Sequence, residues 1–189
     1  GGCAVKVGSC GKTATVADLQ DVLLRVMQGV SAVAARAADK GVRDAEVDAF
    51  TPHAWFTTLT NVNFDEARFL KLIATALRMR EKIHAAAMAA GADLSDLPEP
   101  ATWEPGATLA ELSAAAPMAS IQRFVDRDGP SIVGLRDLIL YGLKGTAAYS
   151  EHARVLGTEE AEVVAEFHRI SAFLATDPTD VDALLREAL

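Results

Sequence analysis

The chain has 189 residues, half of them hydrophobic, which is enough for a sizeable core in one compact domain or two small ones. Its formal net charge is −8 and it has no basic patch interleaved with aromatic residues, so we expect no nucleic-acid partner. No apolar run reaches the length of a membrane span and no signal peptide is visible, so we expect no membrane partner.

The N-terminal segment 1–12 contains both cysteines of the chain, Cys3 and Cys10, among several glycines. A cysteine pair in front of a helical body favours a bound metal or iron–sulfur cluster, but two thiolates are half of the four ligands that a tetrahedral site requires. A local disulfide, or two inert thiols, explains the pair equally well on composition alone. Two cysteines in an otherwise cysteine-free chain are more typical of a reducing compartment than of a disulfide framework, so we expect a cytoplasmic protein.

Three helices are predicted within residues 13–91, at 15–40, 44–59 and 65–90. Apolar residues recur in them at three- and four-residue spacing, which is the pattern of a helix with one buried face. Pro52 is expected to kink or split the second helix. Gly29 lies in the middle of the first helix, where glycine costs about 1 kcal/mol relative to alanine. We therefore expect Gly29 to permit a close helix crossing.

The turn at residues 60–63, Thr60-Asn61-Val62-Asn63, is short, polar and placed between two helices. The plain interpretation is a capped turn, with Asn63 as the cap of the following helix. Because polar turns held by rigid elements also carry binding residues, this turn is the one candidate binding surface outside the cysteine segment.

Prolines break the helical pattern after residue 91, and residues 92–127 are predicted to be a linker with short helices that begin near 108 and 118. Helices at 131–156, 158–175 and from 179 onward then form a second bundle, 128–189. An offset of about 116 residues relates the two halves and pairs Gly29 with Gly145, which indicates an internal duplication. The last helix has no stop signal, so we expect this bundle to be truncated and the natural chain to continue.

These elements predict an all-α fold of two pseudo-repeated three-helix bundles joined by a proline-rich linker. Other motifs carry little chemistry. Residues 8–13 are similar to the end of a phosphate-binding loop, but Lys6 stands where the motif requires glycine. Glu81 and His84 form one Glu-x-x-His step, whereas a di-iron bundle needs two. We therefore predict no catalytic residue.

Several segments resemble one family, the hybrid-cluster proteins, also known as prismane proteins and hydroxylamine reductases. They cover essentially the whole chain and are 2–13, 18–21, Phe56-Thr57-Thr58-Leu59-Thr60-Asn61-Val62-Asn63-Phe64-Asp65, 134–136, Tyr141-Gly142-Leu143-Lys144-Gly145 and 149–153. The long segment around Thr60 is the most specific of them. The helical domain of nickel carbon monoxide dehydrogenases is similar at a greater distance.

The resemblance implies a helical first domain with a cubane 4Fe-4S cluster held by four cysteines. Cys3 and Cys10 match the third and fourth of these, and the first two would lie upstream of Gly1. Thr60 and Asn61 are implied to face the cavity of the hybrid cluster. The ligands of the hybrid cluster itself belong to later domains of the family.

From the resemblance we expect the N-terminal iron–sulfur electron-transfer domain of a hybrid-cluster oxidoreductase, which reduces hydroxylamine or related nitrogen oxides. The isolated chain is not expected to be catalytic, because it lacks the hybrid-cluster active site. Its expected partners are a redox protein and either the remaining domains of such an enzyme or a second copy of the chain, which would supply the two further cysteines. The alternative is a cluster-free helical structural or interaction module derived from that family.

Overall fold

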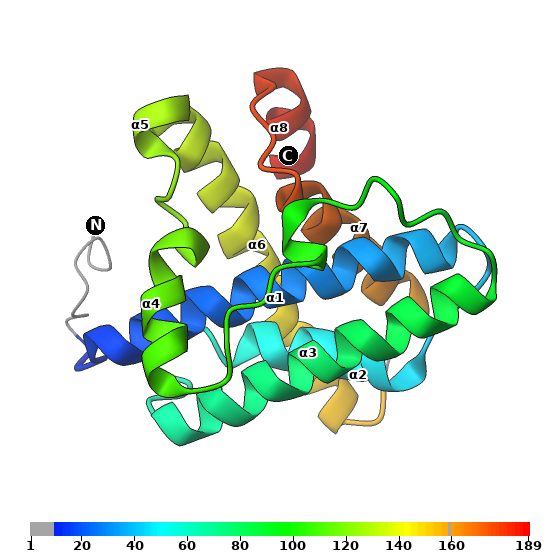
Figure 1. Cartoon of the computed structure of the whole chain (residues 1–189), viewed down its shortest axis with the longest axis horizontal. Helices are drawn as coiled ribbons and strands as arrows, with labels where there is room; N and C mark the ends of the chain where they lie inside the picture. Colours follow the sequence, from blue (N-terminus) through cyan, green and yellow to red (C-terminus); the bar gives the residue numbers. More distant parts are fainter. Residues whose placement is uncertain (1–9, 159) are drawn as a thin grey trace.

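The computed structural model describes residues 10–158 and 160–189, and every regular element in these ranges is helical. This confirms the predicted all-α fold. Figure 1 shows the elements, which are α1 (Ala14–Ala38), α2 (Ala45–Phe56), α3 (Glu66–Ala89), the 3₁₀ helix η1 (Glu99–Ala101), α4 (Leu109–Ala119), α5 (Val125–Asp128), α6 (Pro130–Val155), α7 (Ala161–Ala175) and α8 (Val181–Ala188).

Side-chain caps mark the starts of five helices, α1, α2, α3, α4 and α8, and the cap of α3 differs from the one predicted. Thr13 caps α1 by accepting a hydrogen bond from the Val16 amide at 3.2 Å, so this helix begins one residue earlier than expected. Asp65 caps α3, whereas the predicted cap Asn63 accepts from the amide of Asp65 and shapes the turn before it. An aspartate or asparagine can fill either role, because both side chains accept hydrogen bonds from nearby amides.

The second helix continues past Pro52 as one element, so the predicted split does not occur. It ends at Phe56, three residues before the predicted end. The hydroxyls of Thr57 and Thr58 donate to the carbonyls of Ala54 and Trp55, each at 2.7 Å. These side chains satisfy carbonyls that a longer helix would have bonded to amides, and so they favour termination.

The two halves of the chain share one hydrophobic core. Helix α1 lies between α3 of its own half and α7 of the other, while α2 packs on α6 (Figure 1). Trp55 of α2 meets Phe167 of α7 edge to face, with ring centroids 5.4 Å apart. The division into a bundle at 13–91 and a bundle at 128–189 thus stays a prediction about sequence, while the packing joins both into one body.

The predicted linker 92–127 is packed along α1 through η1 and α4. Gly29 is where this packing is tightest, because a Cβ at this position would overlap the carbonyl oxygen of Pro100. Arg80 holds that carbonyl in place from the other side with a 3.1 Å hydrogen bond. Gly29 therefore does permit a close approach, but to the backbone of η1 and not to a crossing helix.

The same prediction is wrong for Gly145 as a packing site within this chain. A Cβ added there would meet nothing within 4 Å. The sequence offset pairs Gly145 with Gly29, but the second half has no counterpart of η1 above this position in the described residues.

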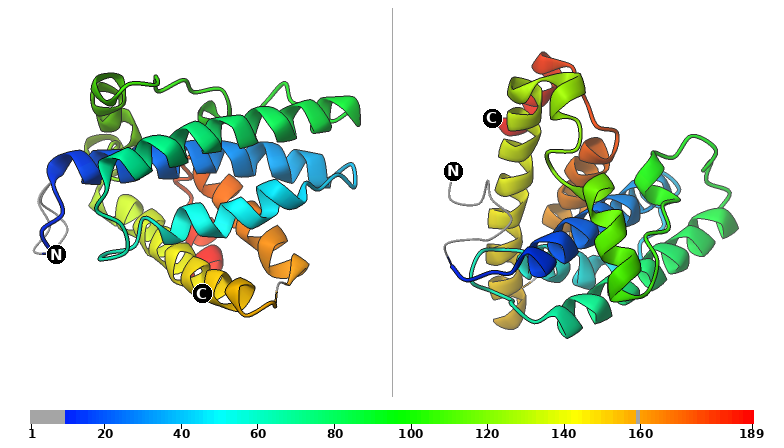
Figure 2. Two further views of the ribbon diagram at one scale, coloured as in Figure 1. Left: turned by 90° about the horizontal axis from the view of Figure 1, so that it is seen from below. Right: turned by 60° about the vertical axis from the view of Figure 1, so that its left-hand side comes forward.

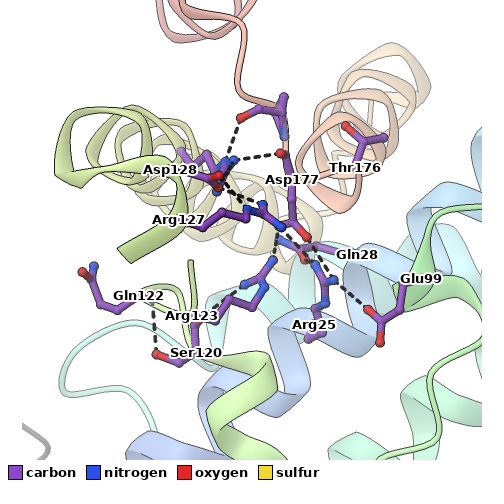
Figure 3. Close-up of polar contacts among 12 residues, drawn as sticks. Arg25, Gln28, Glu99, Ser120, Gln122, Arg123, Arg127, Asp128, Thr176 and Asp177 are labelled. Carbon is purple, nitrogen blue, oxygen red and sulfur yellow. Dashed lines mark hydrogen bonds and ion pairs between the residues drawn. The ribbon is translucent and has the colours of Figure 1, made fainter. Parts of the chain in front are cut away.

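The halves are also joined by a buried charge cluster centred on Asp177, in the turn between α7 and α8 (Figure 3). Arg25 of α1 reaches the Asp177 carboxylate at 3.2 Å and Glu99 at 2.6 Å. Arg123 pairs with the same carboxylate from the segment before α5. The Arg25 side chain is 4% exposed, so removing its counter-charges would leave a buried cation.

Arg136 of α6 completes this cluster through the backbone. Its guanidinium donates to the carbonyls of Asp177 and Pro178, each at 2.8 Å, and pairs with Asp128 at 2.7 Å. Asp177 has φ 50°, a left-handed conformation that aspartate tolerates better than most residues. Those hydrogen bonds hold the turn in this conformation.

Replacing Gly29 by alanine should lower the free energy of unfolding by about 1–3 kcal/mol, because the new methyl overlaps the Pro100 carbonyl. Gly145→Ala is the matched control and should raise it by up to about 1 kcal/mol, since the methyl enters open space and alanine is the better helix former. Urea unfolding of both variants measures this. Equal effects of the two substitutions would contradict the packing described for Gly29.

Asp177→Asn keeps the shape and the backbone conformation but removes the charge between Arg25 and Arg123. We expect a loss of about 3 kcal/mol of stability, because two buried guanidinium groups lose their shared counter-ion. Arg169→Ala, which breaks the ion pairs of a half-exposed arginine with Glu166 and Glu187, should cost less than about 1 kcal/mol. Denaturant unfolding would show similar losses for both if the Asp177 cluster were unimportant.

Candidate functional site

Of the two predicted cluster ligands, Cys3 lies outside the described residues and Cys10 lies within them. Cys10 is a free, half-buried thiol in a turn just before α1. Three residues later Thr13 caps the helix, so the thiol stands close to the positive end of the α1 dipole. The chain places Cys10 where it can bind a group that is also open to solvent.

Two contacts fix the segment that follows Cys10. The ammonium of Lys12 donates to the Gln20 side chain of α1 at 2.8 Å. The Thr13 hydroxyl lies 3.5 Å from the carboxylate of Glu66, the first residue of α3. The starts of α1 and α3 therefore lie close together, toward the left side of the molecule in Figure 1.

The turn at residues 60–63 leads directly into α3 and so lies at the same end as Cys10. Thr60 and Asn61 are both exposed. Asn61 has φ 65°, so the turn contains a left-handed residue that only a few side chains adopt readily. The structure thus brings Cys10 and the turn at residues 60–63 to one end of the fold, although it describes no direct contact between them.

Lys144 of α6 contacts the segment just before this turn, and the sequence analysis did not identify it. Its ammonium donates to the carbonyl of Thr58 at 3.4 Å, and the residue is 8% exposed. A buried lysine is uncommon unless it is paired. The sequence signal that could have identified Lys144 is its position between Leu143 and Gly145 in a segment that resembles the family.

Two aspartates with raised pKa values surround Lys144. Burial raises the pKa of Asp21 to about 6, against the opposing charges of Lys144 and Lys12. Burial likewise raises the pKa of Asp137 to about 6, against its hydrogen bond from Gln122 and the charge of Lys144. The 116-residue offset pairs these two aspartates. Sequence reasoning recorded that pairing as a sign of duplication and missed its electrostatic meaning.

Cys10 stands apart from other metal ligands in the described part of the chain, where no group of three or more His, Cys, Asp and Glu side chains could hold an ion. The remaining histidine candidates are accounted for by packing. His168 is buried and bonds to Ser31 at 3.1 Å and Asp48 at 3.3 Å, while His152 meets the Phe56 ring. Glu81 and His84 are exposed on α3.

None of the described helices has the length and the apolar composition that a membrane-spanning helix requires.

Stability should depend on pH through Asp21. Its pKa in the folded chain, about 6, exceeds the value near 4 of an unfolded aspartate, so the folded state binds this proton more tightly. The stabilisation is full below about pH 4 and is lost as the pH rises through 6. Asp21→Asn should therefore gain stability relative to the unmodified chain between pH 4 and pH 7, by on the order of 2 kcal/mol. Urea titrations across this range test it, and a constant difference would refute it.

The whole length of the chain matches known proteins. Residues 1–189 match the Prismane/CO dehydrogenase family. The chain is 46% identical over 192 residues to a protein named hydroxylamine reductase from Burkholderia lata, and equally to those of two strains of Burkholderia ambifaria. All of this chain is covered in each case, but it spans only 35% of the length of these relatives. The chain belongs to the Prismane/CO dehydrogenase family.

Proposed function

We propose that this chain is the N-terminal electron-transfer domain of a hydroxylamine reductase-like hybrid-cluster oxidoreductase, and that it binds an iron–sulfur cluster of the 4Fe-4S type through Cys3 and Cys10. The relatives support the class of enzyme, since those matched over the full chain are named hydroxylamine reductases. They are also much longer, which supports a domain within a larger protein.

The observation that carries the proposal is the setting of Cys10. Its thiol is free, half-buried and attached to the rigid start of α1. A cluster near a protein surface can exchange electrons with a partner protein, whereas one buried in the bundle core could not be reached. Lys12 and the positive end of α1 lie on the same side and would favour the negative charge of a thiolate-ligated cluster.

The donor set is incomplete within the described residues. Cys10 is one soft ligand, and a cubane cluster takes four thiolates. Cys3 would supply the second, and an upstream segment or a second copy of the chain would supply the other two. The bound cluster would carry single electrons; the described residues would position it and tune the charge around it.

Lys144 and the two aspartates would set that charge. Both carboxylates are partly buried and feel the charge of Lys144, so the net charge of this group changes near pH 6. Thr60 and Asn61, exposed at the same end, would face the domains that hold the catalytic centre. Reduction of hydroxylamine or a related nitrogen oxide would take place in those domains, with electrons delivered through this one by a redox partner.

Anaerobic reconstitution tests the cluster. The chain, supplied with iron and sulfide under argon, should gain visible iron–sulfur charge-transfer absorption and stoichiometric iron. Cys10→Ser and Cys3→Ser should each lose most of both signals. Thr60→Ala, at the same end of the molecule but without a thiol, is the matched control and should keep them.

A product that contains no iron and stays colourless both for this chain and for a longer version with the upstream segment would contradict the proposal. It would support the alternative of a cluster-free structural or interaction module. Colour in the longer version alone would show that the upstream segment supplies the other two ligands.

A further inference from the structure

Helix α6 has one long face that the described chain leaves largely open. Three- and four-residue spacing places a set of its residues on one side of the helix. This face, here named the α6 face, consists of Gly134, Leu138, Gly142, Gly145, Tyr149, His152 and the C-capping Leu156. Only at His152 does a described ring, that of Phe56 of α2, pack against it. Leu138 is 55% exposed, Tyr149 81% and Leu156 84%. In both views of Figure 2 the helix runs along an edge of the molecule.

The α6 face carries no charged residue, although the chain as a whole is rich in charges. The opposite side of the same helix is conventional, with Leu140, Leu143 and Ala147 buried in the core. Large apolar side chains gathered on an exposed surface mark an interaction site more often than a solvated one. The side of α6 that faces away from the core thus has the composition of an interface.

The three glycines of the α6 face leave its surface without a side chain at three positions. A Cβ placed on Gly134, Gly142 or Gly145 would meet nothing within 4 Å, so none of them is required by packing among the described residues. Each weakens an exposed helix by about 1 kcal/mol relative to alanine. Glycines along one face let another backbone approach closely. Gly29 shows this within the chain, since the backbone of Pro100 fills the space above it.

An apolar groove of about 270 Å³ continues the face beyond Tyr149. It is lined by residues that include Tyr149 and Ala153 of α6 and Val163 and Val164 of α7. The α6 face and the groove adjoin each other at Tyr149. A second polypeptide can lie along the glycines and place a side chain in the groove.

We propose that the α6 face is the surface on which the remaining domains of the full-length protein dock, a step that rests on the function proposed above. The relatives carry nearly two-thirds of their length outside the matched segment. The last helix, α8, packs on α6, so polypeptide continuing from α8 would start beside this helix. A tethered domain has an effective concentration on the order of millimolar and can use one helix face, whereas separate copies need roughly 800 Å² from each partner.

The test uses a chimera in which this chain replaces the matching 192-residue segment of the Burkholderia lata hydroxylamine reductase. Leu138→Glu should leave the melting temperature of the 189-residue chain unchanged and lower that of the chimera by several degrees. Met118→Glu, on α4, is the matched control because this methionine is also 55% exposed, and it should change neither. Equal effects of Leu138→Glu and Met118→Glu in the chimera would overturn the proposal.

Gly145→Ala is expected to change the melting temperature in opposite directions in the chain alone and in the chimera. It should raise the melting temperature of the chain alone, through helix propensity, and lower that of the chimera, through the lost close approach. A rise in both would overturn the role of the glycine face. Iron content measured on the same samples separates the two proposals, because loss of docking should leave the cluster in place, and failure of cluster binding should leave docking in place.

Hydroxyl-radical footprinting tests the same proposal without a chimera. In the unmodified Burkholderia lata enzyme, the segment that matches α6 should be protected from hydroxyl radicals, and it should be labelled when the 192-residue segment is made alone. Equal labelling would overturn the proposal. Concentration-dependent dimerisation of the 189-residue chain that Leu138→Glu abolishes would assign the face to a second copy and likewise overturn it.

Discussion

The fold depends on one carboxylate. Asp177 stands between the guanidinium groups of Arg25 and Arg123, while its carbonyl receives Arg136. Burial and the neighbouring charges of Arg25 and Arg136 lower the pKa of Arg123, and Asp177 opposes that effect. The cluster therefore joins α1, the segment before α5, α6 and the turn before α8. Losing its central carboxylate would leave the buried Arg123 without a carboxylate partner among the described residues, and Arg25 with Glu99 alone. This is why the two halves of the chain form one body.

The position of the candidate site follows from that constraint. Helix α1 is held by Arg25 near its middle and by Gly29 against η1, and its N-terminal half is buried in the core, with α3 and α4 packed against the helix. Thr13 at its start contacts Glu66 of α3, and Cys10 precedes it by three residues. The core packing of α1 therefore determines where Cys10 lies.

The sequence was sufficient for what depends on local chemistry. Glycine stops, the capping box at Thr108 and Glu111 and the apolar stripes predicted most helices to within a few residues, because each signal acts within one or two turns. The exception is the short helix expected to begin near 118, since α4 extends to Ala119 and the next helix begins at Val125. It was insufficient wherever the partner is distant in sequence. Gly29 was expected to meet a helix and meets the Pro100 backbone, and the burial of Asp21 depends on packing that no local pattern records. The membership in the family came from long motifs, which preserve distant contacts that periodicity does not reveal.

The two glycines that the sequence offset pairs differ in what covers them. In the first half, η1 lies across the helix and Gly29 is covered from within the chain. In the second half the corresponding helix keeps Gly145 and adds Gly142 and Gly134 on the same side, and none of the described residues fills the space above them. A glycine that packing does not require would be free to become alanine, which stabilises a helix. The presence of three such positions beside Leu138 and Tyr149 is therefore better explained by a contact outside the described residues than by packing among them.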